Sequence, residues 1–155
     1  MAANFKFYMQ EVKWNGSEYA TIGEPKDLEK DFEGLRYGKC QGLDTIGSAR
    51  IYKEEYADSD RLRVFIPTEL TNEATEVNLS LYFIGENRRE TFDSFCEYIR
   101  KGYHLYYDNV RKKKLYFYVE KPIKTNEDEN KGSKPYINAI FTLQNIFGKT
   151  SEATI

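Results

Sequence analysis

The residues that could do chemistry are few, and they lie far apart in the sequence. His104 is the only histidine of the chain, so a Ser–His–Asp arrangement or a histidine-containing zinc site would have to use it. It lies between Tyr103 and Leu105 in a predicted strand, and nothing nearby is typical of an activated nucleophile. We therefore interpret His104 as a histidine on a sheet face rather than as a catalytic residue.

The cysteines and acidic residues also show no recognisable site. Cys40 and Cys96 are too few for a disulfide scaffold and lack the neighbours that zinc needs, so we interpret them as free thiols. The glycines of residues 34–47 match no phosphate-binding fingerprint. Acidic pairs such as Glu54-Glu55 could serve glycoside hydrolysis only at the right spacing in space, and solvated surface charge is the simpler interpretation. The sequence predicts no metal site, no cofactor and no enzyme.

A basic run, Arg111 to Lys114, is the sharpest local charge feature. It could contact phosphates or the carboxylates of a neighbouring protein, or it could only keep a hairpin tip soluble and closed to edge pairing. Tyr106, Tyr116 and Tyr118 of the same predicted hairpin could stack on bases. The formal net charge of −2 and the acidic segment that follows argue against nucleic-acid binding.

The composition is that of one folded, aromatic-rich domain. The 155 residues are 40% hydrophobic and 31% charged, which is enough for a core without disulfides. The 13 tyrosines and 10 phenylalanines favour strands. No apolar stretch is long enough to span a bilayer, and the first residues do not look like a signal peptide. We expect one β-rich domain over residues 1–148 and a flexible tail over residues 149–155.

Alternation of apolar and polar residues predicts a mainly antiparallel β structure. Asn15-Gly16 predicts a tight turn between a first strand at residues 5–9 and a second at 19–22, which Pro25 ends. The clearest strand covers residues 76–85, where one face is apolar and the other polar. The other predicted strands are at residues 49–56, 61–66, 103–107, 115–120 and 136–143.

One amphipathic helix is predicted over residues 88–101. Asn87 can cap it, and Glu90 follows three residues later, as in a capping box. One apolar stripe follows helical spacing and should pack on the sheet: Phe92, Phe95, Cys96 and Ile99. The predicted fold class is therefore an antiparallel β-sandwich or barrel with one flanking helix.

The order of the elements in the C-terminal half is more informative than any single residue. An alternating strand leads to a capped helix, a basic tyrosine-rich hairpin, a polar loop over residues 125–134 and a last strand. With the segments YYDNVRKKKLYF (106–117) and IFTLQNIFG (140–148), this order resembles that of tail-tube, distal-tail and tail-completion proteins of tailed bacteriophages. The resemblance covers about half of the chain and implies a β-barrel or sandwich with one flanking helix.

The resemblance also implies a function and a place in the particle. The chain would be a virion tail subunit, assembled in the host cytoplasm with other tail proteins and without a membrane. Identical subunits, typically six, would form a ring around a channel through which DNA passes. The hairpin tip and the polar loop would contact neighbouring subunits, where opposite charges could pair. The candidate interface residues are Arg111, Lys112, Lys113, Lys114, Glu127, Asp128, Glu129, Tyr116 and Tyr118.

The sequence is also compatible with two other functions. A small monomeric module for carbohydrate or peptide would bind its ligand with exposed tyrosine faces and Trp14. An enzyme of an unrecognised type would need a deep pocket that holds paired carboxylates with perturbed pKa values. The mass in solution and direct binding measurements distinguish these possibilities.

Overall fold

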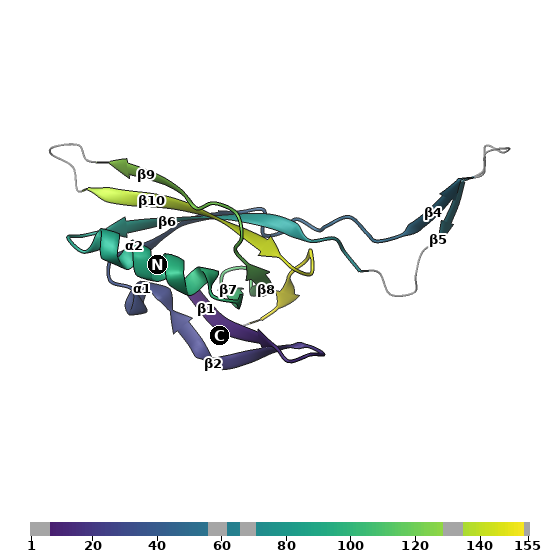
Figure 1. The fold of residues 1–155 in the computed structure, drawn as a ribbon, viewed down its shortest axis with the longest axis horizontal. Coiled ribbons are helices and arrows are strands. Elements are labelled where there is room, and N and C mark those ends of the chain that lie inside the picture. The colour runs from purple at the N-terminus through teal and green to yellow at the C-terminus, as the bar shows by residue number, and fades with distance from the viewer. Residues whose placement is uncertain (1–6, 56–61, 66–70, 129–134, 154–155) are drawn as a thin grey trace.

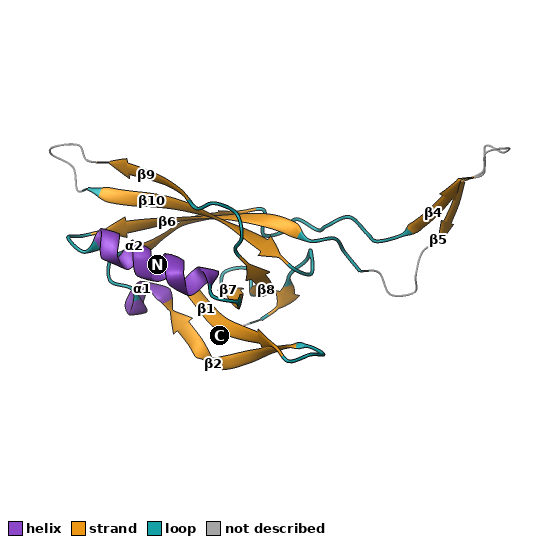
Figure 2. Ribbon diagram, viewed as in Figure 1, coloured by secondary structure: helices purple, strands orange, loops and turns teal. Residues whose placement is uncertain are grey.

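The computed structural model describes residues 7–55, 62–65, 71–128 and 135–153. Within these residues the chain is mainly antiparallel β-sheet, with one long helix beside the sheet (Figures 1 and 2). The predicted class, a β-rich fold with one flanking helix, is confirmed.

Nine of the described strands form one sheet. Seven of them follow the order β2-β1-β7-β8-β10-β6-β3, while β9 pairs with β10 and β11 pairs with β8. The path ends at β2 and β3 and does not close into a barrel. Figure 1 shows β1 and β2 below β6 and β10, so the sheet is sandwich-like. The bounds are β1 (Phe7–Trp14), β2 (Tyr19–Asp27), β3 (Leu35–Gln41), β6 (Thr75–Ile84), β7 (Tyr103–Asp108), β8 (Lys113–Tyr118), β9 (Lys124–Asp128), β10 (Tyr136–Asn145) and β11 (Ser151–Glu152).

The predicted turn at Asn15-Gly16 joins β1 to β2. Asn15 Oδ1 accepts hydrogen bonds from the backbone N–H groups of Ser17 and Glu18 at 3.0 and 2.9 Å, and Gly16 has a φ of 100°. The prediction that Pro25 ends the second strand is wrong, because β2 continues to Asp27. This strand lies at one end of the sheet path, where a proline need not donate a ladder hydrogen bond.

The predicted helix is present as α2 (Arg88–Arg100). Phe95 and Ile99 are fully buried, and Phe95 lies edge-on to Phe141 of β10 with ring centroids 5.2 Å apart. The predicted side-chain cap is wrong, because Asn87 makes no capping hydrogen bond. Its carbonyl accepts the Thr91 N–H instead, at 3.0 Å. A second, short helix, α1 (Leu28–Asp31), follows β2 and buries Leu28.

An arm leaves the main sheet between β3 and β6. At its root, Gly47 N–H donates to Gly148 O at 2.8 Å and Arg50 N–H donates to Thr71 O at 2.9 Å. Farther out, β4 (Tyr52–Glu55) and β5 (Leu62–Phe65) pair with each other as a separate two-stranded sheet, as the sequence predicts. Figure 1 shows this hairpin well away from the nine-stranded sheet.

Part of the predicted flexible tail is tied to the sheet. Ser151 and Glu152 form β11 and pair with Lys114 and Lys113 of β8, and Ala153 N–H donates to Lys112 O at 3.0 Å. Residues 151–153 therefore cover the first part of β8 along one edge. Among the described residues, no helix has the length and apolar character needed to cross a membrane.

Candidate functional site

The basic tip between β7 and β8 is built on a buried carboxylate. Asp108, 4% exposed, accepts the backbone N–H groups of Val110 and Arg111 at 3.0 Å each through Oδ1. Lys112 adopts a left-handed backbone conformation, with a φ of 56°. Because an aspartate commonly bonds backbone N–H groups two or three residues further on, the turn has a fixed shape despite its charge.

Among the described residues, two of the four basic side chains of the tip have acidic partners. Arg111 Nη1 lies 3.7 Å from Asp44 Oδ2, and Lys113 Nζ lies 3.3 Å from Asp44 Oδ1. Arg111 Nε also lies 4.0 Å from Asp108 Oδ2. The two pairs with Asp44 are exposed, so each contributes under about 1 kcal/mol to stability. Asp44 could not be predicted as a partner, because no local sequence pattern places it beside Arg111 and Lys113.

The acidic candidates lie at the other end of β10 from the basic tip. Glu127 and Asp128 form the end of β9 and pair with Ile137 and Tyr136 at the start of β10. The end of β10, in contrast, pairs with β8 through Gln144 and Asn145. At about 3.4 Å per residue, these two ends of β10 are roughly 30 Å apart. The sequence predicted a loop over residues 125–134, but residues 125–128 belong to strand β9, so this part of the prediction is wrong. Glu129 lies outside the described residues.

The two candidate tyrosines belong to a cluster of aromatic side chains outside the main core. Leu115, Phe117 and Val119 pack into the core, as predicted, while Tyr116 and Tyr118 are half-buried on the other face. The ring of Tyr116 lies 5.4 Å from that of Phe147, and Tyr118 lies 6.2 Å from Tyr103. Lys114 Nζ stands 5.8 Å from the Tyr116 ring centroid. Both tyrosine rings thus have aromatic neighbours in their own chain.

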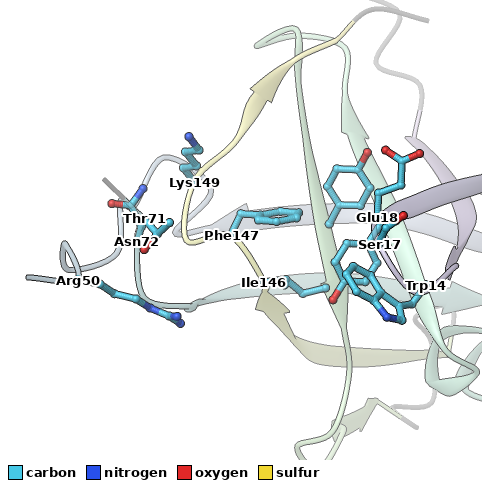
Figure 3. A pocket seen from close by; sticks show the side chains of 11 residues that line it. Trp14, Ser17, Glu18, Arg50, Thr71, Asn72, Ile146, Phe147 and Lys149 are labelled. Carbon is cyan, nitrogen blue, oxygen red and sulfur yellow. The ribbon is translucent and has the colours of Figure 1, made fainter. Parts of the chain in front are cut away.

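A pocket of about 700 Å³ opens beside these tyrosines, at the root of the arm. It lies between the β1–β2 turn, the residues that anchor the arm, and the segment after β10 (Figure 3). We call it the aromatic pocket. Its lining residues are Trp14, Ser17, Glu18, Tyr19, Arg50, Thr71, Asn72, Tyr116, Ile146, Phe147 and Lys149.

Four rings of the aromatic pocket contact one another. Tyr19 lies 4.8 Å from Trp14 and 5.7 Å from Phe147, measured between ring centroids. Trp14 is 47% exposed and Phe147 is 43% exposed, so part of each ring remains open to solvent. The sequence pointed to Trp14 and to tyrosine faces, but it gave no sign that Phe147 and Arg50 would lie near them.

His104 is fully buried, and it lines neither the aromatic pocket nor the pocket beside Gly34 and Pro135. Its ring stacks on Phe117 at 5.7 Å and lies 4.8 Å from the Tyr98 ring. Burial lowers the pKa of His104, while the charge of Glu11 opposes this shift. Within the described parts of the chain, no group of three metal-ligating side chains comes together.

No protein-family model matches the sequence, and comparison with curated proteins finds no relative.

Proposed function

We propose that this protein is a non-enzymatic structural subunit that assembles with copies of itself. The observation that carries the proposal is the arm, whose two-stranded end lies apart from the nine-stranded sheet (Figure 1). An isolated two-stranded hairpin is marginally stable at best in water, because it has no hydrophobic face to pack against. The hairpin of β4 and β5 therefore needs a partner surface beyond its own sheet.

Backbone hydrogen bonds and close backbone contacts hold the root of the arm. Besides the bonds at Gly47 and Arg50, Glu73 N–H donates to Ser48 O at 2.8 Å. Gly47 and Gly148 both pack so closely against the Glu73 carbonyl that an added Cβ would clash with it. A root of this kind fixes where the arm leaves the sheet, while its outer strands remain available to a neighbour.

The geometry favours rings or tubes over closed pairs. An arm that reaches a different surface on the next copy makes a head-to-tail contact, and such contacts generate rings when the rotation closes and filaments when it does not. The basic tip and the acidic end of β9 lie at opposite ends of β10. Because of this separation, charge pairing between them would join different copies rather than one copy to itself.

We further propose, from the resemblance to phage tail proteins, that the assembly is part of a virion tail. In this role a ring, typically of six copies, surrounds a channel through which DNA passes, and other tail proteins bind its faces. The sandwich-like sheet with one flanking helix supports this assignment. The net charge of −2 also supports it, because a channel for passing DNA must not retain the DNA.

Light scattering coupled to size exclusion, followed by negative-stain microscopy, tests the proposal. We expect the full chain to form one species of several subunits, seen as rings or short tubes. In the test variant, residues 51–70 are replaced by Asn-Gly, which closes a tight turn between Arg50 and Thr71 because their backbones are already hydrogen-bonded. We expect this armless variant to fold and to remain monomeric.

A matched control tests whether assembly needs the sequence of the arm or only a segment of its length. In the control, a Gly–Ser segment of the same length replaces residues 51–70, and we expect it to stay monomeric as well. Assembly of the armless variant to the same size as the full chain would contradict the role of the arm. A full chain that stays monomeric at high concentration would contradict self-assembly itself.

A further inference from the structure

The aromatic pocket combines open ring faces with charged side chains. Trp14 and Phe147 expose nearly half of their surface, and Figure 3 shows Arg50 and Lys149 across the pocket from Glu18. Among the described residues, none of these three charged side chains forms an ion pair or a hydrogen bond. We propose that the aromatic pocket is a binding site for a short acidic saccharide.

The rings provide the apolar part of such a site. The C–H face of a sugar ring packs against an aromatic face, and Trp and Tyr combine a large apolar body with a polar tip. The Tyr19 ring contacts both Trp14 and Phe147, and the Tyr116 ring lies edge-on to Phe147 with centroids 5.4 Å apart. Each ring is therefore fixed by its neighbours before a ligand arrives, which lowers the entropy lost on binding.

The polar side chains favour a ligand that carries a negative charge. Arg50 and Lys149 bring two positive charges to the pocket, and Glu18 brings one negative charge. An arginine can bind a carboxylate through two parallel hydrogen bonds. Glu18, Asn72 and Thr71 can bind sugar hydroxyls, because carboxylate, amide and hydroxyl groups are hydrogen-bond acceptors or donors of the right kind.

The backbone around the pocket argues for a saccharide over an extended peptide. A peptide commonly binds by adding a strand to a free sheet edge through main-chain hydrogen bonds. Here the Ile146 N–H already donates to Tyr116 O at 3.0 Å, and the Arg50 N–H donates to Thr71 O at 2.9 Å. Recognition must therefore use side chains. The volume of about 700 Å³ also lies within the usual range for small-ligand sites.

The test uses the fluorescence of Trp14, the only tryptophan of the chain. Its emission is recorded during titration with a hyaluronan tetrasaccharide, which is acidic, and with tri-N-acetylchitotriose, which is neutral. We expect a saturable change with the acidic saccharide and at least tenfold weaker binding of the neutral one. Arg50→Gln and Lys149→Gln should each weaken acidic binding about tenfold.

Lys101→Gln is the matched control, because it removes an exposed positive charge outside the pocket and should leave binding unchanged. Tyr116→Ala should weaken binding of both saccharides, which calorimetry can measure independently of fluorescence. Saturable binding of an acidic peptide with no response to either saccharide would overturn the proposal, and so would equal binding by the Arg50→Gln variant. Light scattering on the same samples reports the oligomeric state. Because one chain supplies the whole site, saccharide binding can be observed whether or not the protein assembles.

Discussion

Tyr107 donates a buried hydrogen bond of 2.6 Å from its hydroxyl to Oε1 of Gln10, which lies 97 residues earlier in the chain. The same Gln10 donates from Nε2 to the carbonyl of Gly23 at 2.6 Å. Gln10 lies where the register between β1 and β2 shifts, and it is only 6% exposed. One side chain thus joins β7, β1 and β2 at the point where the backbone ladder is interrupted.

We expect Gln10→Leu to lower the free energy of unfolding by about 1–3 kcal/mol, because it leaves the buried Tyr107 hydroxyl without its acceptor. Urea unfolding followed by circular dichroism measures this loss. Gln41→Leu on the exposed part of β3 is the control and should change stability by less than about 0.5 kcal/mol. If Gln10→Leu and Tyr107→Phe have additive effects in a double-mutant cycle, the hydrogen bond does not contribute as described.

His104 should make the protein sensitive to acid. Burial holds the pKa of His104 below 6.5, so the unfolded chain binds this proton at a higher pH than the folded chain does. The stability linked to His104 is therefore fully present above about pH 6.5 and is lost as the pH falls toward the lower, folded-state pKa. Thermal melts between about pH 7.5 and 5 test this.

The variant His104→Phe keeps an aromatic ring between Tyr98 and Phe117 and removes the titrating group. Its melting temperature should vary less over the same pH range than that of the parent. Equal slopes for the two proteins would show that groups other than His104 cause the acid sensitivity.

Phe95 should be essential for stability. Its ring is fully buried between α2 and the sheet, and it lies within 5.2–5.9 Å of the rings of Phe32, Phe83 and Phe141. We expect Phe95→Ala to cost about 3–5 kcal/mol in unfolding free energy. Phe147→Ala, at a position that is 43% exposed, should cost much less. Similar losses for both variants would mean that the helix does not bury Phe95 as described.

Replacing Arg111, Lys112, Lys113 and Lys114 by serine should weaken assembly and leave folding nearly unchanged. The ion pairs with Asp44 are exposed and contribute little to stability. A variant with Lys13, Lys30, Lys39 and Lys101 changed to serine removes the same charge from other exposed positions. Sedimentation at low and high salt compares the two. If the first variant assembles like the parent at both salt concentrations, the tip has no role at a subunit interface.

Local periodicity was enough to predict the helix and most strands. The stripe that contains Phe95 and Ile99 follows helical spacing, and both residues are buried in α2. The alternation from residue 76 to 85 matches β6, where Val77, Leu79 and Phe83 are buried. These predictions succeed because one side of each element must face the core, which requires apolar residues at regular spacing within a short stretch of sequence.

Contacts between distant segments could not be predicted in this way. The aromatic pocket brings Trp14, Arg50 and Phe147 together from three separate parts of the chain, and no local pattern encodes their proximity. Asp44 reaches Arg111 for the same reason. Pro25 misled the prediction because its effect on a strand depends on whether that strand lies at an edge.

During synthesis on the ribosome, β1 must wait for β7 before the two strands can pair. Trp14 ends β1 and Tyr103 begins β7, so about 90 residues separate the two strands. Because synthesis adds about 5–20 residues per second, β7 emerges roughly 5–20 s after β1. Until then β1 and β2 are a lone hairpin with one side unpaired, which is an open template for other nascent chains. We therefore expect the yield of folded protein to depend on chaperones and temperature during expression more than on the stability of the finished sheet.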